Sequence, residues 1–238
     1  MLIKGWLILT LGISPTWAQA QHQSAVHSGP LLAQISTIAA DFENRVHAAG
    51  FPTNMPKPNL FVDTIPQLSL YTRKDNTVHT GSWEDLKPDT QALFIRWAGY
   101  AGDTSGRQLF DDMFHRFFLT HELAHWLQFQ TPNPENVTNF YQRELSANRI
   151  SIAYWRKKDP AYLLLLVARF RRIRGHLPDP VPSDQNAQQY FNANYSQLGS
   201  NAGVYGWYQL GLVISAFDER PSPTFVEILR QISEGRNR

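Results

Sequence analysis

Apolar side chains recur at helical spacing in the first quarter of the chain. They stand three or four positions apart, at Leu31, Ile35, Ile38, Phe42 and Val46. That period places them on one face of an α-helix. Pro30 stands at the start of the pattern and Gly50 follows it, and these two residue types commonly begin and end helices. We therefore expect an amphipathic helix over residues 30–49.

Residues 51–100 have a different pattern, which predicts a small β-sheet. The segment is rich in Pro, Thr, Asn and Gly, and its short apolar or β-branched runs are Leu60–Ile65, Leu68–Thr72, Thr77–His79 and Ala92–Trp97. The run Lys74-Asp75-Asn76 is typical of a hairpin turn. From Gln108 onward the pattern is mostly helical. The fold class expected is α+β, a small mixed sheet followed by a predominantly helical region, in a single domain over residues 21–238.

The first twenty residues have the features of a secretory signal peptide. One cation, Lys4, precedes the apolar stretch Trp6–Ile13, and Ala18-Gln19-Ala20 has the small-residue spacing of a cleavage site. We expect cleavage after Ala20 and a secreted protein, periplasmic or extracellular. A short membrane anchor or a buried first helix is the alternative. The apolar stretch is too short to span a bilayer, so we expect no stable membrane anchor after cleavage.

Composition narrows the choice of function. The chain has 238 residues, a formal net charge of +2 and no cysteine. So small a positive charge gives no reason to expect a nucleic-acid partner. Without cysteine the chain has neither a disulfide, nor a thiolate metal site, nor a cysteine nucleophile.

One motif stands out, H-E-L-A-H at residues 121–125. Side chains four apart lie on one face of a helix, so His121 and His125 can bind one metal ion. Glu122 is one step round the helix, within reach of a water molecule without being a ligand. The residues from Gln108 to Phe129 contain no Gly or Pro and are apolar on several faces. Such a helix is expected to be central, and buried histidines there need partners or a metal.

A third ligand is available downstream. Catalytic zinc usually takes three protein ligands, and Glu144 follows His125 by nineteen residues on a second helical segment. If Thr138 caps that helix after a loop through 130–137, Glu144 falls in its second turn, level with the histidines. Glu135 is the rival ligand, but it lies in the expected loop.

This motif with its spaced glutamate resembles the gluzincin branch of the zincin metallopeptidases. The resemblance covers only residues 108–155 and implies a Zn²⁺ cofactor held by His121, His125 and Glu144, with Glu122 as general base. It also implies that Asn148, where many members carry Asp, orients a ligand imidazole from outside the ligand set. The metzincin pattern does not fit, since Gln128 and Thr131 stand where that group has Gly and a third His.

The resemblance further implies a Tyr or His that stabilises the reaction's oxyanion. Tyr205 is our choice, because Gly203 and Gly206 beside it leave room for a substrate. Tyr208 and His176 are the other candidates, and a structural role in the core is equally open for these tyrosines.

In zincins an edge strand also lines the cleft and pairs with an extended peptide. Ala92–Trp97, the last predicted strand before the motif helix, is the candidate for that strand. The expected partner is thus a peptide or protein substrate in extended conformation. Two alternatives remain: a zincin-fold protein that only binds, or a zinc amidase or esterase acting on a non-protein substrate.

Overall fold

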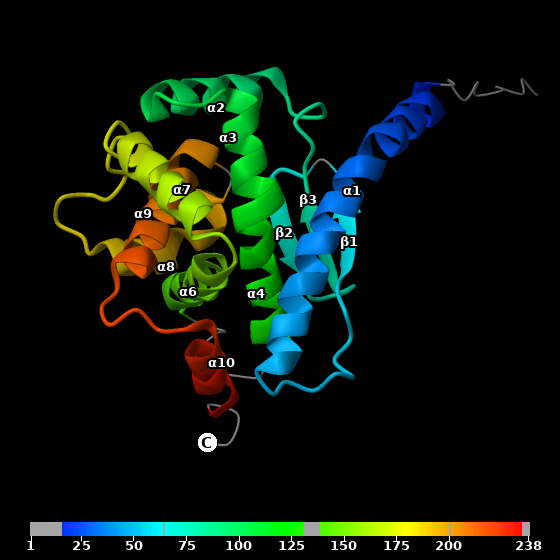
Figure 1. Ribbon diagram of the computed structural model, residues 1–238. Helices are drawn as coiled ribbons and strands as arrows, with labels where there is room; N and C mark the ends of the chain where they lie inside the picture. Colours follow the sequence, from blue (N-terminus) through cyan, green and yellow to red (C-terminus); the bar gives the residue numbers. More distant parts are fainter. Residues whose placement is uncertain (1–15, 64, 131–138, 200, 235–238) are drawn as a thin grey trace, which may run out of the picture.

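The computed structural model describes residues 16–63, 65–130, 139–199 and 201–234, which form a helical body with one small sheet (Figure 1). In chain order the elements are α1 (Thr16–Ala48), β1 (Asn59–Val62), β2 (Ser69–Thr72), β3 (Thr77–Thr80), α2 (Pro88–Ala101), α3 (Gly106–Asp112), the π-helical segment η1 (Met113–Phe117), α4 (Phe118–Gln130), α6 (Phe140–Lys158), α7 (Pro160–Arg174), α8 (Ala187–Leu198), α9 (Ala202–Asp218) and α10 (Phe225–Glu234). The predicted α+β class, with a small mixed sheet ahead of the helical region, is confirmed.

Helix α1 is longer than the sequence pattern predicts. It begins at Thr16, so the expectation that Pro30 starts the helix is wrong. Proline lacks the N–H that would bond to the preceding turn, but its fixed φ suits a helix, and a helix can continue through it with one bond missing. The predicted apolar face is confirmed, with Phe42 and Val46 fully buried. Gly50 follows the end of the helix with a φ of 98°.

The predicted signal peptide falls mostly outside the described residues. Residues 1–15 are not described, and residues 16–20 form the beginning of α1. Among the described helices, none combines the length and the apolar character needed to cross a membrane.

The sheet has three strands in the order β1-β3-β2. Strand β1 runs parallel to β3, with Asn59 opposite Thr77, and β2 runs antiparallel to β3, with Ser69 opposite Thr80. The predicted hairpin turn is confirmed: it joins β2 to β3, and Asn76 takes a left-handed φ of 53°. Strand β2 is therefore an edge strand, and it packs against α4.

The fourth predicted strand, Ala92–Trp97, is wrong, because these residues lie within helix α2. Pro88 occupies the first turn, and Gly102 ends the helix in a left-handed conformation with a φ of 81°. The buried residues of α2 are Phe94, Trp97, Ala98 and Ala101. This spacing of three and four is helical, so apolar burial along one face outweighs the β-propensity of the run.

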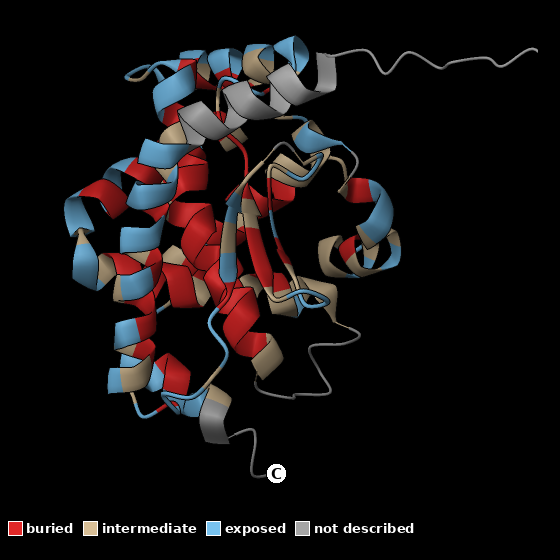
Figure 2. Ribbon diagram, turned by 90° about the vertical axis from the view of Figure 1, so that its right-hand side faces the viewer, coloured by how far each residue is buried: buried red, intermediate tan, exposed pale blue. Residues whose placement is uncertain are grey.

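Helix α3, the π-helical segment η1 and helix α4 follow one another without a break and form one helical rod. Every residue of α4 from Phe118 to Gln128 is buried, and Figure 2 shows the buried residues concentrated in the middle of the molecule, along this helix and the adjoining strands. The prediction of a central helix from Gln108 to Phe129 is confirmed. It places the histidine motif at the centre of the molecule.

Helix α6 packs against α4 and carries the predicted third ligand. Its N-cap is Asn139, whose side-chain oxygen accepts a hydrogen bond from the backbone N–H of Gln142 at 3.2 Å. The predicted cap, Thr138, and the rival ligand, Glu135, lie outside the described residues, as do residues 131–137 of the predicted loop. Gln130, its first predicted residue, belongs to α4. Glu144 is in the second turn of α6, as expected.

Candidate metal centre

The two histidines of the motif face the same side of α4. Their ring centroids are 4.6 Å apart and their planes nearly perpendicular, at 87°. His121 is 2% exposed and His125 8% exposed. Two imidazoles so deeply buried need polar partners, and these come from α6 and from α4 itself.

Glu144 reaches across from α6 to both rings. Its Oε2 lies 3.1 Å from Nε2 of His121 and 3.5 Å from Nε2 of His125. These three residues are the one group of metal-ligating side chains found in the described part of the chain, with ligand atoms within 4.8 Å of one another. The structure therefore brings together the three predicted ligands.

An amide oxygen holds the other ring nitrogen of each histidine. Nδ1 of His121 donates to Oδ1 of Asn148 at 2.9 Å, and Nδ1 of His125 donates to Oε1 of Gln128 at 2.8 Å. The Gln128 side chain also donates through Nε2 to the backbone oxygen of Arg143 at 3.1 Å, which ties α4 to α6. Both imidazoles are thereby fixed with Nδ1 protonated and Nε2 directed at Glu144.

This arrangement suits a cation. A neutral imidazole has one N–H, yet all four ring nitrogens of His121 and His125 face oxygen acceptors. With both N–H groups directed outward, the two Nε2 lone pairs and the Glu144 carboxylate converge on one point. A metal ion shared by these three atoms satisfies them together, and two imidazoles with one carboxylate are a common ligand set for catalytic zinc.

Charge also couples the three side chains. Burial raises the pKa of Glu144, but the positive charge that His125 carries when it is protonated, together with the hydrogen bonds from both histidines, outweighs it and leaves that pKa well below its ordinary value. Burial lowers the pKa of His125, but the Glu144 carboxylate raises it more. Glu144 is therefore ionised, which is the state a ligand carboxylate requires.

Glu122 is held by the edge strand. Its Oε2 accepts a hydrogen bond from the backbone N–H of Tyr71, in β2, at 2.8 Å. Glu122 is not part of the three-residue ligand group, but it lines the same cavity. This is the placement that the sequence predicts for a group acting beside the ligands.

The three oxyanion candidates occupy different places. Tyr205 lines the cavity, and its hydroxyl oxygen accepts from Nε2 of Gln209 at 2.8 Å. Burial raises the pKa of Tyr205 well above its ordinary value, so the phenol keeps its proton. Tyr208 is not among the residues lining the cavity and belongs to an apolar cluster with Phe191, against which Tyr205 also packs. His176 stacks on Tyr100 at a centroid distance of 4.5 Å and is not among the residues lining the cavity.

The cavity has a volume of about 480 Å³ and an apolar end. Aromatic rings of the lining follow one another from Trp97 through Phe94, Phe114 and Phe118 to His121, with successive centroids 5.3–5.7 Å apart. Ser69, Leu70 and Tyr71 of strand β2 line it as well. Strand β2 therefore takes the place at the cleft that the sequence analysis gave to Ala92–Trp97.

Three residues of the site are not predicted from the sequence. Tyr195, in α8, donates its hydroxyl hydrogen to Oε1 of Glu144 at 2.8 Å. Gln209, in α9, donates from Nε2 to Oε2 of Glu144 at 2.9 Å. Gln128 is the partner of His125 described above. Gln128 lies three residues after His125 on the same helix, so its spacing could have indicated it; nothing local marks Tyr195 or Gln209.

Compared with protein-family models, with curated proteins and with solved structures, the chain matches none of them. The functional assignment therefore depends on the motif and on the geometry of the site.

Proposed function

We propose that this protein is a zinc-dependent hydrolase of gluzincin type that cleaves peptide bonds. The observation that carries the proposal is the convergence of Nε2 of His121, Nε2 of His125 and Oε2 of Glu144 on one point, 3.1–3.5 Å from ring nitrogen to carboxylate. A purely structural metal site has no need of a further carboxylate beside its ligands. Glu122 is buried, lines the same cavity and supplies such a carboxylate.

In this proposal His121, His125 and Glu144 hold the ion. When bound, Zn²⁺ supplies a Lewis acid for a carbonyl oxygen and lowers the pKa of a water molecule toward about 7. Glu122 accepts the proton of the attacking water and later passes it to the leaving nitrogen. The Tyr71 N–H holds one of its oxygens, so the carboxylate is positioned before a substrate arrives.

The edge strand supports an extended peptide as the substrate. In the antiparallel pair, Gly81 N–H bonds to Leu68 C=O, so the peptide groups of alternate residues, Ser69 and Tyr71, face away from β3. The Tyr71 N–H is taken by Glu122. The Ser69 N–H and C=O are in register to pair with a substrate strand beside the metal centre.

The apolar end of the cavity favours a substrate with a large apolar side chain next to the cleaved bond. Its lining on the His121 side is Phe94, Trp97, Met113, Phe114, Phe118 and Leu210. Of the described residues that line this end, none is charged. A lysine or aspartate side chain would lose its hydration there without gaining a partner, whereas an aromatic ring would be buried at a gain of about 2 kcal/mol.

A peptide library tests the proposal. The chain from Gln21 onward is incubated with the library beside Glu122→Gln, and Glu227→Gln serves as the matched control because Glu227 is exposed on α10. We expect cleavage beside large apolar residues, unchanged in the control and at least about 10²-fold slower in Glu122→Gln. Cleavage that survives Glu122→Gln would remove this residue from its role. Absence of any cleavage by zinc-loaded protein would favour a binding protein, and turnover of another amide or an ester would change the substrate.

Metal analysis tests the centre separately. We expect one zinc per chain in the wild type and none in Glu144→Ala. Iron in the wild type would instead indicate the oxidative chemistry that two histidines and a carboxylate also support.

We further propose export through a signal peptide, residues 1–20. The N-terminal sequence of the protein recovered from an exporting host should then begin at Gln21. An N-terminus at Met1 would contradict it.

A further inference from the structure

Two buried amide side chains, Asn148 of α6 and Gln209 of α9, link His121 to Glu144 through hydrogen bonds. Asn148 is completely buried and Gln209 is 5% exposed. Oδ1 of Asn148 accepts from His121, and its Nδ2 donates to Oε1 of Gln209 at 3.3 Å. Nε2 of Gln209 donates in turn to Oε2 of Glu144 at 2.9 Å and to the Tyr205 hydroxyl at 2.8 Å.

These contacts form a closed ring. It runs from His121 through Asn148 and Gln209 to Glu144, and Glu144 meets His121 again at Nε2. Each amide uses both its oxygen and its nitrogen, so the direction of every hydrogen bond in the ring is fixed by its neighbours. Such a ring has one pattern of donors and acceptors, so replacing one of its residues changes the hydrogen bonds of the others.

We propose that Asn148 and Gln209 act as a single positioning unit, in which residue 148 must be an amide because it has to donate to Gln209 as well as accept from His121. The inference rests on the proposed function in that His121 and Glu144 are taken to hold Zn²⁺. The unit fixes the His121 ring, directs Oε2 of Glu144 toward the ion, and orients the Tyr205 hydroxyl. It explains why this chain has Asn where a stronger acceptor, Asp, would otherwise serve His121 better.

An aspartate at position 148 shows why the two residues depend on each other. A carboxylate has two acceptors and no donor, so it would face Oε1 of Gln209 across the 3.3 Å that the Asn148 amide now bridges. If the Gln209 amide turned to donate to Asp, its oxygen would face the Glu144 carboxylate instead. Either arrangement leaves a buried acceptor against an acceptor, and the second also takes from Glu144 the hydrogen bond that Gln209 donates.

The experiment is a double-mutant cycle on Zn²⁺ affinity, measured by competition with a chromogenic chelator. The four proteins are the wild type, Asn148→Asp, Gln209→Met and the double variant; methionine keeps the length of glutamine without its polar atoms. We expect Asn148→Asp alone to weaken Zn²⁺ binding by roughly tenfold. In the Gln209→Met background we expect the same change to strengthen binding, because the carboxylate is a stronger acceptor for His121 and no longer faces Oε1 of Gln209. An equal effect in both backgrounds overturns the proposal.

Controls separate this proposal from the proposed function. Asn186→Asp adds the same charge at the exposed N-cap of α8, where Asp caps as well as Asn, and it should leave Zn²⁺ affinity unchanged. The urea midpoints of the four metal-free proteins give a second readout, which should also be non-additive. If no protein of the set binds Zn²⁺ but the midpoints remain non-additive, the metal assignment fails and the unit stands. Additive midpoints together with additive affinities refute the unit alone.

Discussion

The two tyrosines beside Glu144 differ in how their hydroxyl hydrogens are used. Tyr195 donates its hydrogen to Oε1 of Glu144 at 2.8 Å. The Tyr205 oxygen instead accepts from Gln209 at 2.8 Å, which leaves its own hydrogen for another acceptor in the cavity. Burial raises the pKa of both phenols, so neither loses that hydrogen near neutral pH. In the proposed reaction Tyr205 can therefore donate to a developing oxyanion, and Tyr195 supports the proposed ligand Glu144.

This difference predicts opposite consequences for two conservative substitutions. Tyr205→Phe should lower kcat by about 10²-fold, the usual effect of removing one oxyanion donor, with Zn²⁺ affinity unchanged. Tyr195→Phe should weaken Zn²⁺ binding by roughly tenfold, because Glu144 loses a hydrogen bond, and saturating zinc should restore much of the activity. Steady-state kinetics at several zinc concentrations measures both. The reverse pattern would assign the oxyanion role to Tyr195.

At the scale of residues the sequence indicates the proposed ligands and, through the family resemblance, Asn148 beside His121, but not the other residues that support the ligands. The spacing in the sequence predicts that His121, Glu122 and His125 lie close together, because residues three and four apart are neighbours on a helix. Glu144 follows from helix length and capping. Gln209 is 65 residues from Glu144, and its contact depends on how α9 packs against α6, which no local pattern encodes.

The edge strand β2 predicts a test at the level of an element. The Tyr71 N–H points away from β3 and bonds to Glu122, so a proline there removes this donor without breaking a ladder bond. Tyr71→Pro should reduce kcat by about tenfold or more relative to Tyr71→Ala. Both variants lose the ring that stacks on Phe129 at 5.9 Å, so the alanine variant is the matched control. Equal activity of the two would show that the N–H does not position Glu122.

Elements are predicted well where one signal dominates and poorly where signals compete. The hairpin from Ser69 to Thr80 and the motif helix have consistent patterns and were predicted correctly. In Ala92–Trp97 the β-branched and aromatic residues suggest a strand, but the helical signals of Pro88 and Gly102 lie outside that short run. Pro30 misleads in the same way, since proline commonly marks the start of a helix yet here lies within α1.

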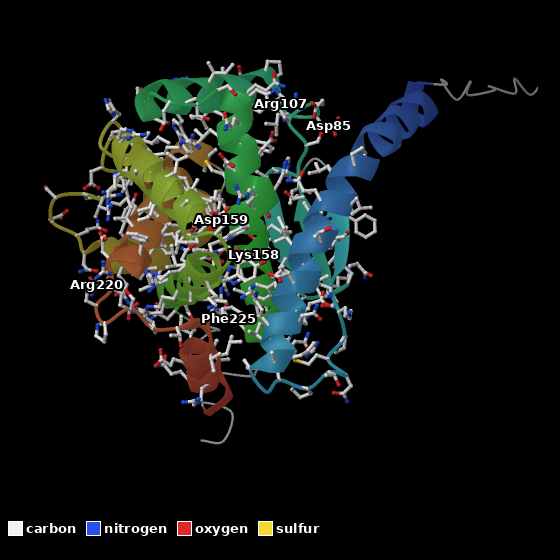
Figure 3. The ribbon with its side chains drawn as sticks, in the orientation of Figure 1. Asp85, Arg107, Lys158, Asp159, Arg220 and Phe225 are labelled. Carbon is white, nitrogen blue, oxygen red and sulfur yellow. The ribbon has the colours of Figure 1, made fainter. Side chains whose placement is uncertain are left out.

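An ion network between α1 and α6 predicts a pH dependence for the whole molecule. Oδ2 of Asp41 accepts from Tyr154 at 2.6 Å and lies 3.0 Å from Arg45 and 3.2 Å from Lys158, which is labelled in Figure 3. Burial raises the pKa of Asp41, but these partners lower it more, so the net pKa is below the ordinary 3.8. A lowered pKa stabilises the folded state above the unfolded-state value, and this contribution is lost as the pH falls through the folded-state value.

Asp41→Asn should therefore lower the free energy of unfolding at pH 7 by about 1 kcal/mol, a modest figure because the pair is partly exposed. The difference from the wild type should shrink below pH 4. Urea unfolding at pH 7 and at pH 3 measures it. Asp184→Asn, which removes the same charge at an exposed loop position, should show no comparable difference. A penalty of equal size at both pH values would mean that the Asp41 charge is not involved.

The proposed metal centre joins the two helices at the middle of the fold, so an ion bound there should stabilise the entire molecule. His121 and His125 come from α4 and Glu144 from α6, and the unfolded chain does not hold these residues together. A ligand bound only by the folded state stabilises it by about 2.7 kcal/mol at a concentration 100 times its Kd. For a chain of this size that corresponds to a fall in Tm of roughly 5–10 °C when a chelator removes the metal. In Glu144→Ala the chelator should have no effect, because the third ligand is already gone. A Tm that is the same with and without chelator in the zinc-loaded wild type would mean that the three side chains do not share an ion in the folded protein.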